Sequence, residues 1–393
     1  MLSRIPLIIA LLASNLVGGS VLQAKELTCS KSIRERLTLS SVDVNEAIAT
    51  NDFFDNPSSL PLGERHHNIV LSPQPNGKSK VAWMDVNNTL HILNLTEYDR
   101  RGESESILKS AELRDMIAHN NGYSVIGLTQ GRMRLVRAAD DTTLHINRFF
   151  QGFPSRSIHQ GSLAFNGTTY AANFGVSKTN HEGDSLSFMD LGGEILAGGR
   201  EFGCSISVDM RVIATAHGFV TLCLSNPYPA AGFHLNYNQK LLLATKSDHR
   251  GNGNGSIGGI VEFGEFLGVA IVKKPGNPLL NTAHLMILES KPPYKTLTHV
   301  LVGNRAKEPG TLLKIAKYDS EHVLLSWYDH SSEMTQFAVY NSKGQLVTPI
   351  ESSPIRAYSR SDFKTFPNGD IGWVSTWGDN KSLKIMRLAH CKD

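Results

Sequence analysis

One structural unit recurs through most of this 393-residue chain, and a tight turn between two strand-like segments marks each copy. A copy contains an apolar strand, the turn, a second strand rich in β-branched and aromatic residues, a variable loop and a third strand. Asn-Gly between such runs is the strongest short-range hairpin signal, because a type I′ turn needs positive φ at both central residues. Seven turns begin 45 to 56 residues apart, at Asn76-Gly77, Asn121-Gly122, Asn166-Gly167, His217-Gly218, Gly264-Glu265, Ser320-Glu321 and Asn368-Gly369.

A repeat of this length is typical of a four-stranded propeller blade. From about residue 60 to residue 391 the chain resembles a seven-bladed β-propeller as an architecture, but the Gly-His and Trp-Asp motifs of WD repeats do not occur at blade spacing. We therefore predict an all-β fold, a seven-bladed β-propeller of four-stranded antiparallel blades. A β-sandwich, a parallel β-helix and a ring of six or eight blades are the alternatives that the repeat leaves open.

The first 24 residues have the three regions of a secretory signal peptide. Arg4 supplies the positive charge, residues 5–17 form an apolar stretch too short for a membrane span, and Ala24 offers a small residue for cleavage. We predict a signal peptide over 1–24, an N-terminal extension over 25–60 and the propeller over 61–393. The protein is therefore expected to be secreted or periplasmic.

The last blade is expected to lack an outer strand, because the chain ends shortly after the segment SLKIMRL. We expect an N-terminal strand to close the ring, supplied by residues 26–32 or by residues 34–40. A short helical turn is predicted around Val42 to Thr50. This pairing would bring Cys29 beside Cys391.

The four cysteines predict disulfides rather than a metal or redox site. None of them belongs to a Cys-x-x-Cys pair, and an even number in an exported chain is typical of disulfide bonding. Four cysteines allow three connectivities. The topology favours Cys29–Cys391 and Cys204–Cys223.

Charge and composition exclude several classes of protein. The chain has 39 Lys+Arg against 36 Asp+Glu, whereas an electrostatic nucleic-acid binder needs a clustered basic excess. No later segment approaches the roughly 20 unbroken apolar residues of a spanning helix. We predict no nucleic-acid partner, no membrane span and no cofactor; a divalent cation bound by converging acids and histidines is a minor alternative.

Blade topology separates the loops into two groups. In an antiparallel four-stranded blade, the first and third turns lie on one face of the disc, and the second loop and the link to the next blade lie on the other. The first turns are short, which predicts little room for a site on their face. Because binding residues concentrate on loops of a rigid scaffold, we predict the site on the other face, which carries the long segments 176–184, 226–232, 246–258, 273–283 and 328–334.

Three of these segments carry acid–histidine combinations. His181, Asp184 and His249 are the candidate catalytic residues, since carboxylates and imidazoles serve as general acids and bases. Aromatic side chains on the same face offer surfaces for stacking a sugar ring. The candidate ligand-binding residues are His181, Glu182, Asp184, Tyr228, Asp248, His249, Arg250, Asn252, Trp327, Asp329, His330 and Trp377.

Two other groups of side chains are assigned structural positions. Trp83 and Trp373 lie in the middle of second strands and are expected to pack between neighbouring blades. Arg132 and Arg134 alternate with apolar residues on one third strand, which is the pattern of a solvated outer face.

The sequence leaves three hypotheses for function. The preferred one is an exported binding propeller that recognises a carbohydrate or protein ligand on its long-loop face. The second is a hydrolase or lyase acting on glycans or small molecules from the same face. The third is a structural or interaction propeller without a small-molecule site.

Overall fold

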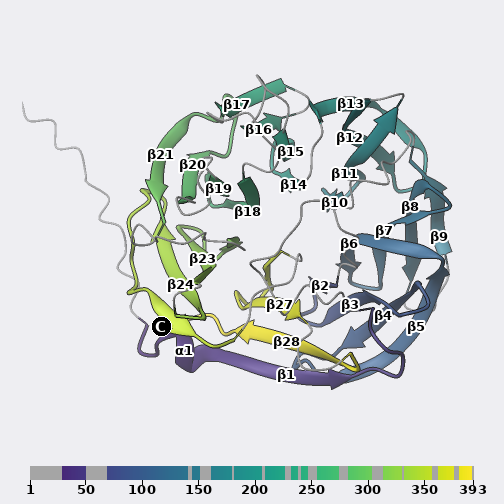
Figure 1. Ribbon diagram of the computed structural model, residues 1–393, viewed down its shortest axis with the longest axis horizontal. Helices are drawn as coiled ribbons and strands as arrows, with labels where there is room; N and C mark the ends of the chain where they lie inside the picture. Colours follow the sequence, from purple (N-terminus) through teal and green to yellow (C-terminus); the bar gives the residue numbers. More distant parts are fainter. Residues whose placement is uncertain are drawn as a thin grey trace, which may run out of the picture.

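The computed structural model contains a ring of β-sheets around a central channel (Figure 1). The described residues form seven four-stranded antiparallel sheets and one short helix. They are residues 29–49, 69–139, 144–150, 161–178, 181–205, 209–225, 232–237, 240–246, 255–273, 282–302, 313–329, 332–355, 362–375 and 380–391. The prediction of an all-β, seven-bladed propeller is confirmed.

Each blade uses four strands that follow one another in the chain. Blade 1 is β2 (Val70–Pro73), β3 (Ser79–Met84), β4 (Thr89–Leu95) and β5 (Arg101–Lys109). Blade 2 is β6 (Ala111–His119), β7 (Gly122–Thr129), β8 (Arg132–Ala139) and β9 (Leu144–Phe149). Blade 3 is β10 (Gly161–Phe165), β11 (Thr169–Lys178), β12 (His181–Asp190) and β13 (Ile195–Ser205).

The remaining blades follow the same order, except that the last one takes its outer strand from the N-terminal side. Blade 4 is β14 (Met210–Thr215), β15 (Gly218–Ser225), β16 (Gly232–Tyr237) and β17 (Lys240–Lys246). Blade 5 is β18 (Gly255–Phe263), β19 (Phe266–Lys273), β20 (Thr282–Glu289) and β21 (Thr296–Leu301). Blade 6 is β22 (Lys314–Lys317), β23 (His322–Asp329), β24 (Met334–Asn341) and β25 (Glu351–Ser353). Blade 7 is β26 (Lys364–Thr365), β27 (Ile371–Ser375), β28 (Ser382–Leu388) and β1 (Leu37–Asp43).

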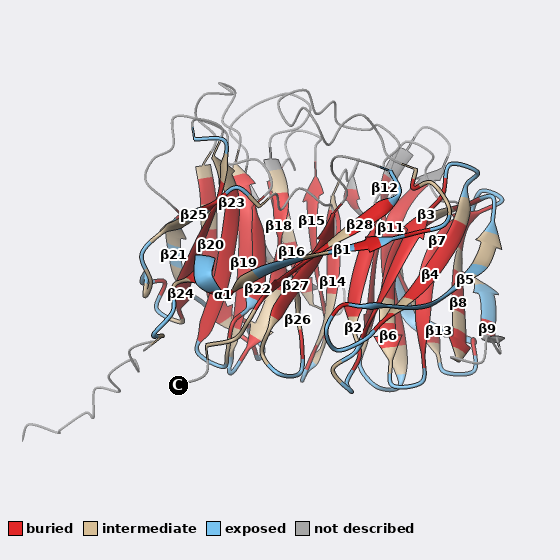
Figure 2. Ribbon diagram, turned by 90° about the horizontal axis from the view of Figure 1, so that it is seen from below, coloured by how far each residue is buried: buried red, intermediate tan, exposed pale blue. Residues whose placement is uncertain are grey.

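The first strand of each blade lines the channel and the fourth lies at the rim (Figure 1). All seven predicted first turns connect the first two strands of a blade. Antiparallel pairing places them on one face, here named the short-turn face, and places the second loops and the links on the opposite, long-loop face. Figure 2 shows these exposed turns below the buried strands.

The ring closes as predicted, because β1 pairs antiparallel with β28 from Leu37↔Leu388 to Asp43↔Ser382. Of the two candidate segments, the one at residues 34–40 overlaps this strand. The predicted helical turn around Val42 to Thr50 is wrong: Val42 belongs to β1, and the helix α1 (Ile33–Arg36) precedes the strand. A capping box between Ser32 and Glu35 fixes the start of α1.

Both predicted disulfides are present. Cys29–Cys391 links the segment before α1 to the residues after β28 and spans 362 residues of sequence. Cys204–Cys223 links β13 of blade 3 to β15 of blade 4 and spans 19 residues. The first bond therefore holds the closing strand, and the second joins two neighbouring blades.

The core lies between the blades, where apolar side chains of adjacent sheets pack together. Figure 2 shows that most strand residues are buried. Trp83 and Trp373 are fully buried in two of these layers, as predicted. The predicted signal peptide and residues 50–68 of the chain lie outside the described residues. In the described part, no helix has the length and apolar character needed to cross a membrane.

Candidate functional site

The acid–histidine cluster around residue 181 lies in a strand. β11 and β12 pair as far as Lys178↔His181, so only residues 179 and 180 separate them. The prediction of a long loop over 176–184 is therefore wrong, because the antiparallel pairing continues almost to the turn. His181 and Glu182 occupy the first two positions of β12, at the long-loop end of blade 3.

Asp184, a candidate catalytic residue, is fully buried. Its Oδ2 accepts a hydrogen bond from Arg200 Nη2 (3.0 Å), and its Oδ1 accepts one from the backbone N–H of Cys204. Asp184, Cys204 and Cys223 are also close enough to suggest a metal site among the described residues, but the two sulfurs form a disulfide and offer no thiolate. Asp184 therefore holds the strands beside the disulfide.

Two candidates from blade 6 lie in or near β23. Trp327 is 6% exposed and belongs to the hydrophobic core between blades 5 and 6. Asp329 is half-buried, and its Oδ2 accepts a hydrogen bond from Ser332 Oγ (2.7 Å) across the second loop. These contacts place Trp327 in the core and Asp329 at the base of a loop on the long-loop face.

The other predicted site residues cannot be placed. Their identification as ligand-binding residues stays a prediction. The candidates that lie outside the described residues are Tyr228, Asp248, His249, Arg250, Asn252, His330 and Trp377.

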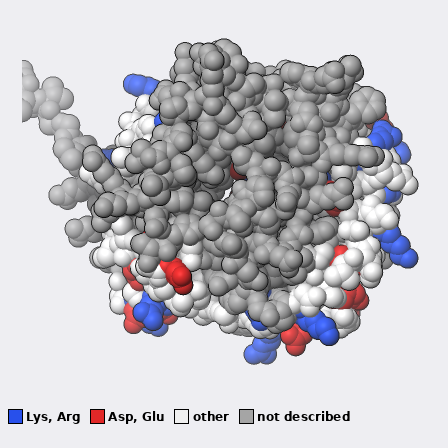
Figure 3. Space-filling model, viewed as in Figure 1, with Lys and Arg blue, Asp and Glu red and all other residues white. Residues whose placement is uncertain are grey.

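Arginine side chains gather on an aromatic ring at the long-loop end of blade 2. Arg132 begins β8 directly after the second turn, and Phe149 ends β9 directly before the link to blade 3. The guanidinium carbons of Arg132 and Arg134 lie 4.4 Å and 5.4 Å from the centroid of the Phe149 ring. The predicted solvated face therefore has an ordered arrangement, in which each guanidinium stacks on the ring. Figure 3 shows Lys and Arg side chains at the rim of the disc.

Side-chain oxygens connect successive blades beside the channel. Each accepts a hydrogen bond from a backbone N–H of the next blade, which would otherwise be an unpaired group on an edge strand. The four acceptor and donor pairs are Ser72 Oγ with Ala118 N, Asp115 Oδ2 with Leu163 N, Ser162 Oγ with Val212 N, and Asp209 Oδ2 with Ile257 N. These contacts fix the orientation of blades 1 to 5 relative to one another.

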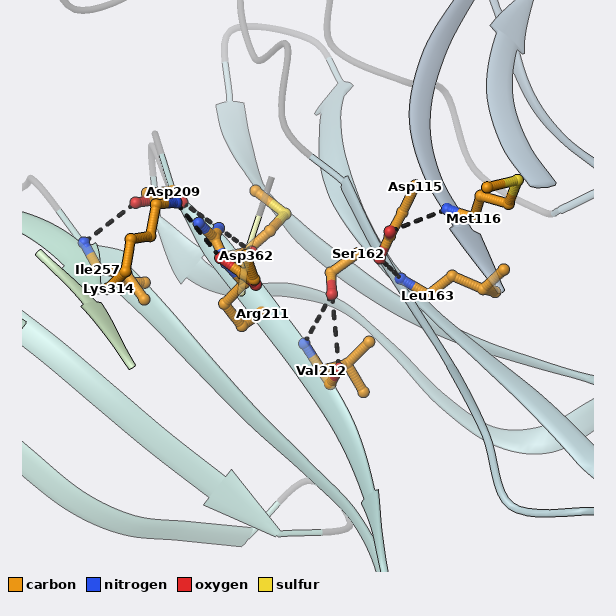
Figure 4. A network of polar contacts seen from close by, with 11 residues as sticks. Asp115, Met116, Ser162, Leu163, Asp209, Arg211, Val212, Ile257, Lys314 and Asp362 are labelled. Atoms are coloured by element: carbon orange, nitrogen blue, oxygen red, sulfur yellow. Dashed lines mark hydrogen bonds and ion pairs between the residues drawn. The ribbon is translucent and has the colours of Figure 1, made fainter. Parts of the chain in front are cut away.

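An ion network of two buried cations and two partly buried carboxylates crosses the channel (Figure 4). Arg211, on β14 of blade 4, donates from Nη1 to Asp209 Oδ1 (2.5 Å) and from Nε to Asp362 Oδ2 (2.7 Å). Asp362 directly precedes β26 of blade 7, so this pair joins blades that are not neighbours in the ring. Lys314 of blade 6 lies 3.5 Å from Asp362 Oδ1. The four charges sum to zero.

Burial and mutual attraction shift the pKa values in this network in opposite directions. Burial lowers the pKa of Lys314 to about 8, although Asp362 opposes the shift. Burial alone would raise the pKa of Asp362, but the charges of Arg211 and Lys314 hold it below its usual range. Asp362 is therefore ionised at neutral pH and serves as the shared partner of both cations.

The channel opens at the short-turn face, where a pocket of about 700 Å³ lies between turns of blades 1, 6 and 7. A second cavity of about 450 Å³ follows the first strands inward to Arg211 and Asp362. The two share the lining residues Pro73, Lys317 and Thr365. The expectation that this face has little room is wrong, because short turns surround the channel mouth without filling it.

A histidine on the short-turn side links blades 2 and 3. His119 Nε2 lies 2.8 Å from Ser124 Oγ and 2.9 Å from Tyr170 Oη, and Ser124 Oγ donates to Tyr170 Oη (2.7 Å). Ser124 is fully buried, so the group joins two sheets and does not present a nucleophile. Burial, with a smaller contribution from Arg137, lowers the pKa of His119 to about 4.

Acid should destabilise the protein through two partly buried histidines. Burial lowers the pKa of His119 and of His284 to about 4, whereas an unfolded histidine titrates near about 6.5. The unfolded state therefore binds more protons between these values, and the free energy of unfolding falls as pH decreases from about 6.5 to 4. After allowance for partial solvent exposure, we expect each residue to contribute about 1–2 kcal/mol of this loss.

Urea unfolding at pH 7 and pH 4.5 checks this prediction. His119→Gln should lose less stability on acidification than the unmodified protein, and His284→Gln is the matched variant in another blade. An identical pH dependence for all three proteins would contradict the assignment.

Comparisons with known proteins bear on the fold. No protein-family model matches the chain, and no curated protein matches it. A chain in the crystal structure of the mitotic checkpoint complex is 11% identical, covers 98% of this chain and 100% of its own length, and has a TM-score of 0.53. The WD40 domain of SCAP from fission yeast is 8% identical over 93% of this chain and 90% of its own, with a TM-score of 0.46. The chain of the mitotic checkpoint complex shares its overall fold with this chain. Identities this low show the fold alone.

Proposed function

We propose that this chain is an exported binding protein that recognises a carbohydrate or protein ligand on its long-loop face. The observation that supports it best is the stack of Arg132 and Arg134 on Phe149 at the long-loop end of blade 2. Among the described residues, neither guanidinium forms an ion pair, so both charges are available to a ligand.

The chemistry of this stack favours an acidic carbohydrate. A guanidinium that lies on a ring keeps its N–H groups free at the edge, where they can bind a carboxylate or sulfate in a bidentate manner. Arg134 Nε also donates to Asn147 Oδ1, which fixes the direction of that side chain. An exposed aromatic ring beside such donors can contact the apolar side of a sugar.

Export is supported by the two disulfides, which are typical of oxidising compartments. The alternative of a hydrolase or lyase has less support, because the carboxylate of Asp184 is buried and already bound to Arg200. A carboxylate in this position has no access to a substrate.

A glycan array tests the proposal. The purified protein should retain oligosaccharides that carry carboxylate or sulfate groups, and Arg132→Gln with Arg134→Gln should weaken that binding at least about tenfold, since each charged hydrogen bond contributes about 1.5–3 kcal/mol. Arg148→Gln is the matched control, because Arg148 lies on the opposite side of β9 and packs against Gly193 of blade 3. An array without acidic hits would contradict an acidic glycan as ligand. Equal binding by the double variant and the unmodified protein would show that the stack of Arg132 and Arg134 on Phe149 is not part of the binding site.

A further inference from the structure

Two adjoining cavities lie along the channel, and the outer one lies between turns of the short-turn face. They share the lining residues Pro73, Lys317 and Thr365, and the inner one ends at the ion network of Arg211 and Asp362. Volumes of about 700 and 450 Å³ are in the range of small-molecule sites. This site is independent of the proposed long-loop function.

The walls of the mouth are held in place before any ligand arrives. The turn after β26 is fixed by hydrogen bonds from Gly369 N to Phe366 O (2.9 Å) and from Phe366 N to Asp370 O (2.7 Å). Gln74, in the first turn of blade 1, donates from Nε2 to His119 O of blade 2 (2.6 Å). Because the wall is preformed, binding of a ligand loses less conformational entropy.

Charged groups of both signs line this space without being paired to each other. Lys317 ends β22, Lys364 begins β26 on the adjacent blade, and Glu262 lies on β18. Among the residues that the structure describes, none of the three forms an ion pair, and Glu262 accepts only a long hydrogen bond of 3.5 Å from Ala216 N.

The other charges of the lining are already engaged. Asp362 binds Arg211, and Asp115 accepts backbone hydrogen bonds from Met116 and Leu163. Asp319 at the mouth lies 2.8 Å from His322 Nδ1. Lys364 is attracted by the charges of Asp115 and Asp362 but forms no ion pair with them among the described residues. The groups that can bind a ligand are therefore the ammonium groups of Lys317 and Lys364 and the carboxylate of Glu262, beside an apolar wall that includes Pro75, Phe366 and Pro367.

We propose that the channel binds a small zwitterion with an apolar side chain, of the amino-acid or short-peptide class, from the short-turn face. Its carboxylate binds the ammonium groups of Lys317 and Lys364, and its ammonium group binds the carboxylate of Glu262. Its apolar part lies against the prolines and Phe366. Charge-assisted hydrogen bonds of this kind fix orientation as well as affinity.

Titration calorimetry on the signal-free chain tests this with L-leucine, L-methionine, L-phenylalanine, L-tryptophan and the dipeptide Gly-Phe as probes. At least one probe should bind, and blocking either of its charges, as in N-acetyl-L-phenylalanine and L-phenylalaninamide for L-phenylalanine, should weaken it about tenfold. Absence of binding by all five probes, or equal binding of blocked and free forms, would overturn the proposal.

Variants of the lining residues test which side chain binds the carboxylate and which binds the ammonium group of the ligand. Glu262→Gln should weaken the free amino acid about tenfold and leave the N-acetyl form unchanged. Lys317→Gln with Lys364→Gln should weaken the free form and leave the amide unchanged. Lys343→Gln, an exposed lysine in a turn of blade 6 outside the cavity, is the control and should bind like the unmodified protein. Equal losses for free and blocked forms would contradict these contacts.

Discussion

Replacing Cys29 and Cys391 with serine should lower the free energy of unfolding by about 5 kcal/mol, because this disulfide closes a loop of 362 residues. A bond across such a loop removes much of the entropy of the unfolded chain. It also keeps β1 next to β28, the pair that completes blade 7. The Cys204–Cys223 bond closes 19 residues, so its replacement should cost about 3 kcal/mol.

Chemical denaturation of the two double-serine variants under identical conditions compares the bonds directly. A larger loss for the Cys204→Ser/Cys223→Ser protein than for Cys29→Ser/Cys391→Ser would show that loop length does not govern the effect. Reducing agent should lower the melting temperature of the unmodified protein and leave that of a variant lacking all four cysteines unchanged.

Arg211→Met should destabilise the fold by about 2–3 kcal/mol, because it leaves the partly buried carboxylates of Asp209 and Asp362 without their main partner. Lys314 stays near Asp362 at 3.5 Å and compensates only one of the two charges. The loss should be measured by urea unfolding at pH 7.

Two further variants make this result specific. Arg132→Met removes an exposed arginine and should change stability by less than about 0.5 kcal/mol. Adding Asp209→Asn to Arg211→Met should recover part of the loss, because the carboxylate of Asp362 then remains beside Lys314 and the charges of the network again sum to zero. A loss for Arg211→Met no greater than for Arg132→Met would mean that the network does not support the ring.

The fold could be predicted because its signals are local and repeated. Each Asn-Gly or equivalent turn fixes one hairpin, and seven hairpins at a similar interval leave few architectures. The closing strand also followed from the sequence, since a blade without an outer strand needs one from elsewhere. The position of α1 was not predicted, although the capping box of Ser32 and Glu35 is a sequence signal for the start of a helix.

The site was harder to predict because strand ends are decided by pairing rather than by composition. The polar residues His181, Glu182 and Asp184 look like a loop, yet β12 includes them because β11 supplies a partner for each. The channel network was missed, although a signal for it exists: Asp115, Ser162 and Asp209 follow one another at 47-residue intervals beside first strands. A polar residue that recurs at the blade period marks the junction between blades.

The pairing of β1 with β28 has a consequence for how the chain folds during synthesis. β1 leaves the ribosome before the strands of blades 1 to 6, and its partner β28 follows them. β1 therefore remains without its partner strand while blades 1 to 6 form one after another. The final blade can assemble only after β28 has been made, so a chain that stops before β28 should expose the unpaired edge of β1 and be a preferred substrate for aggregation or proteolysis.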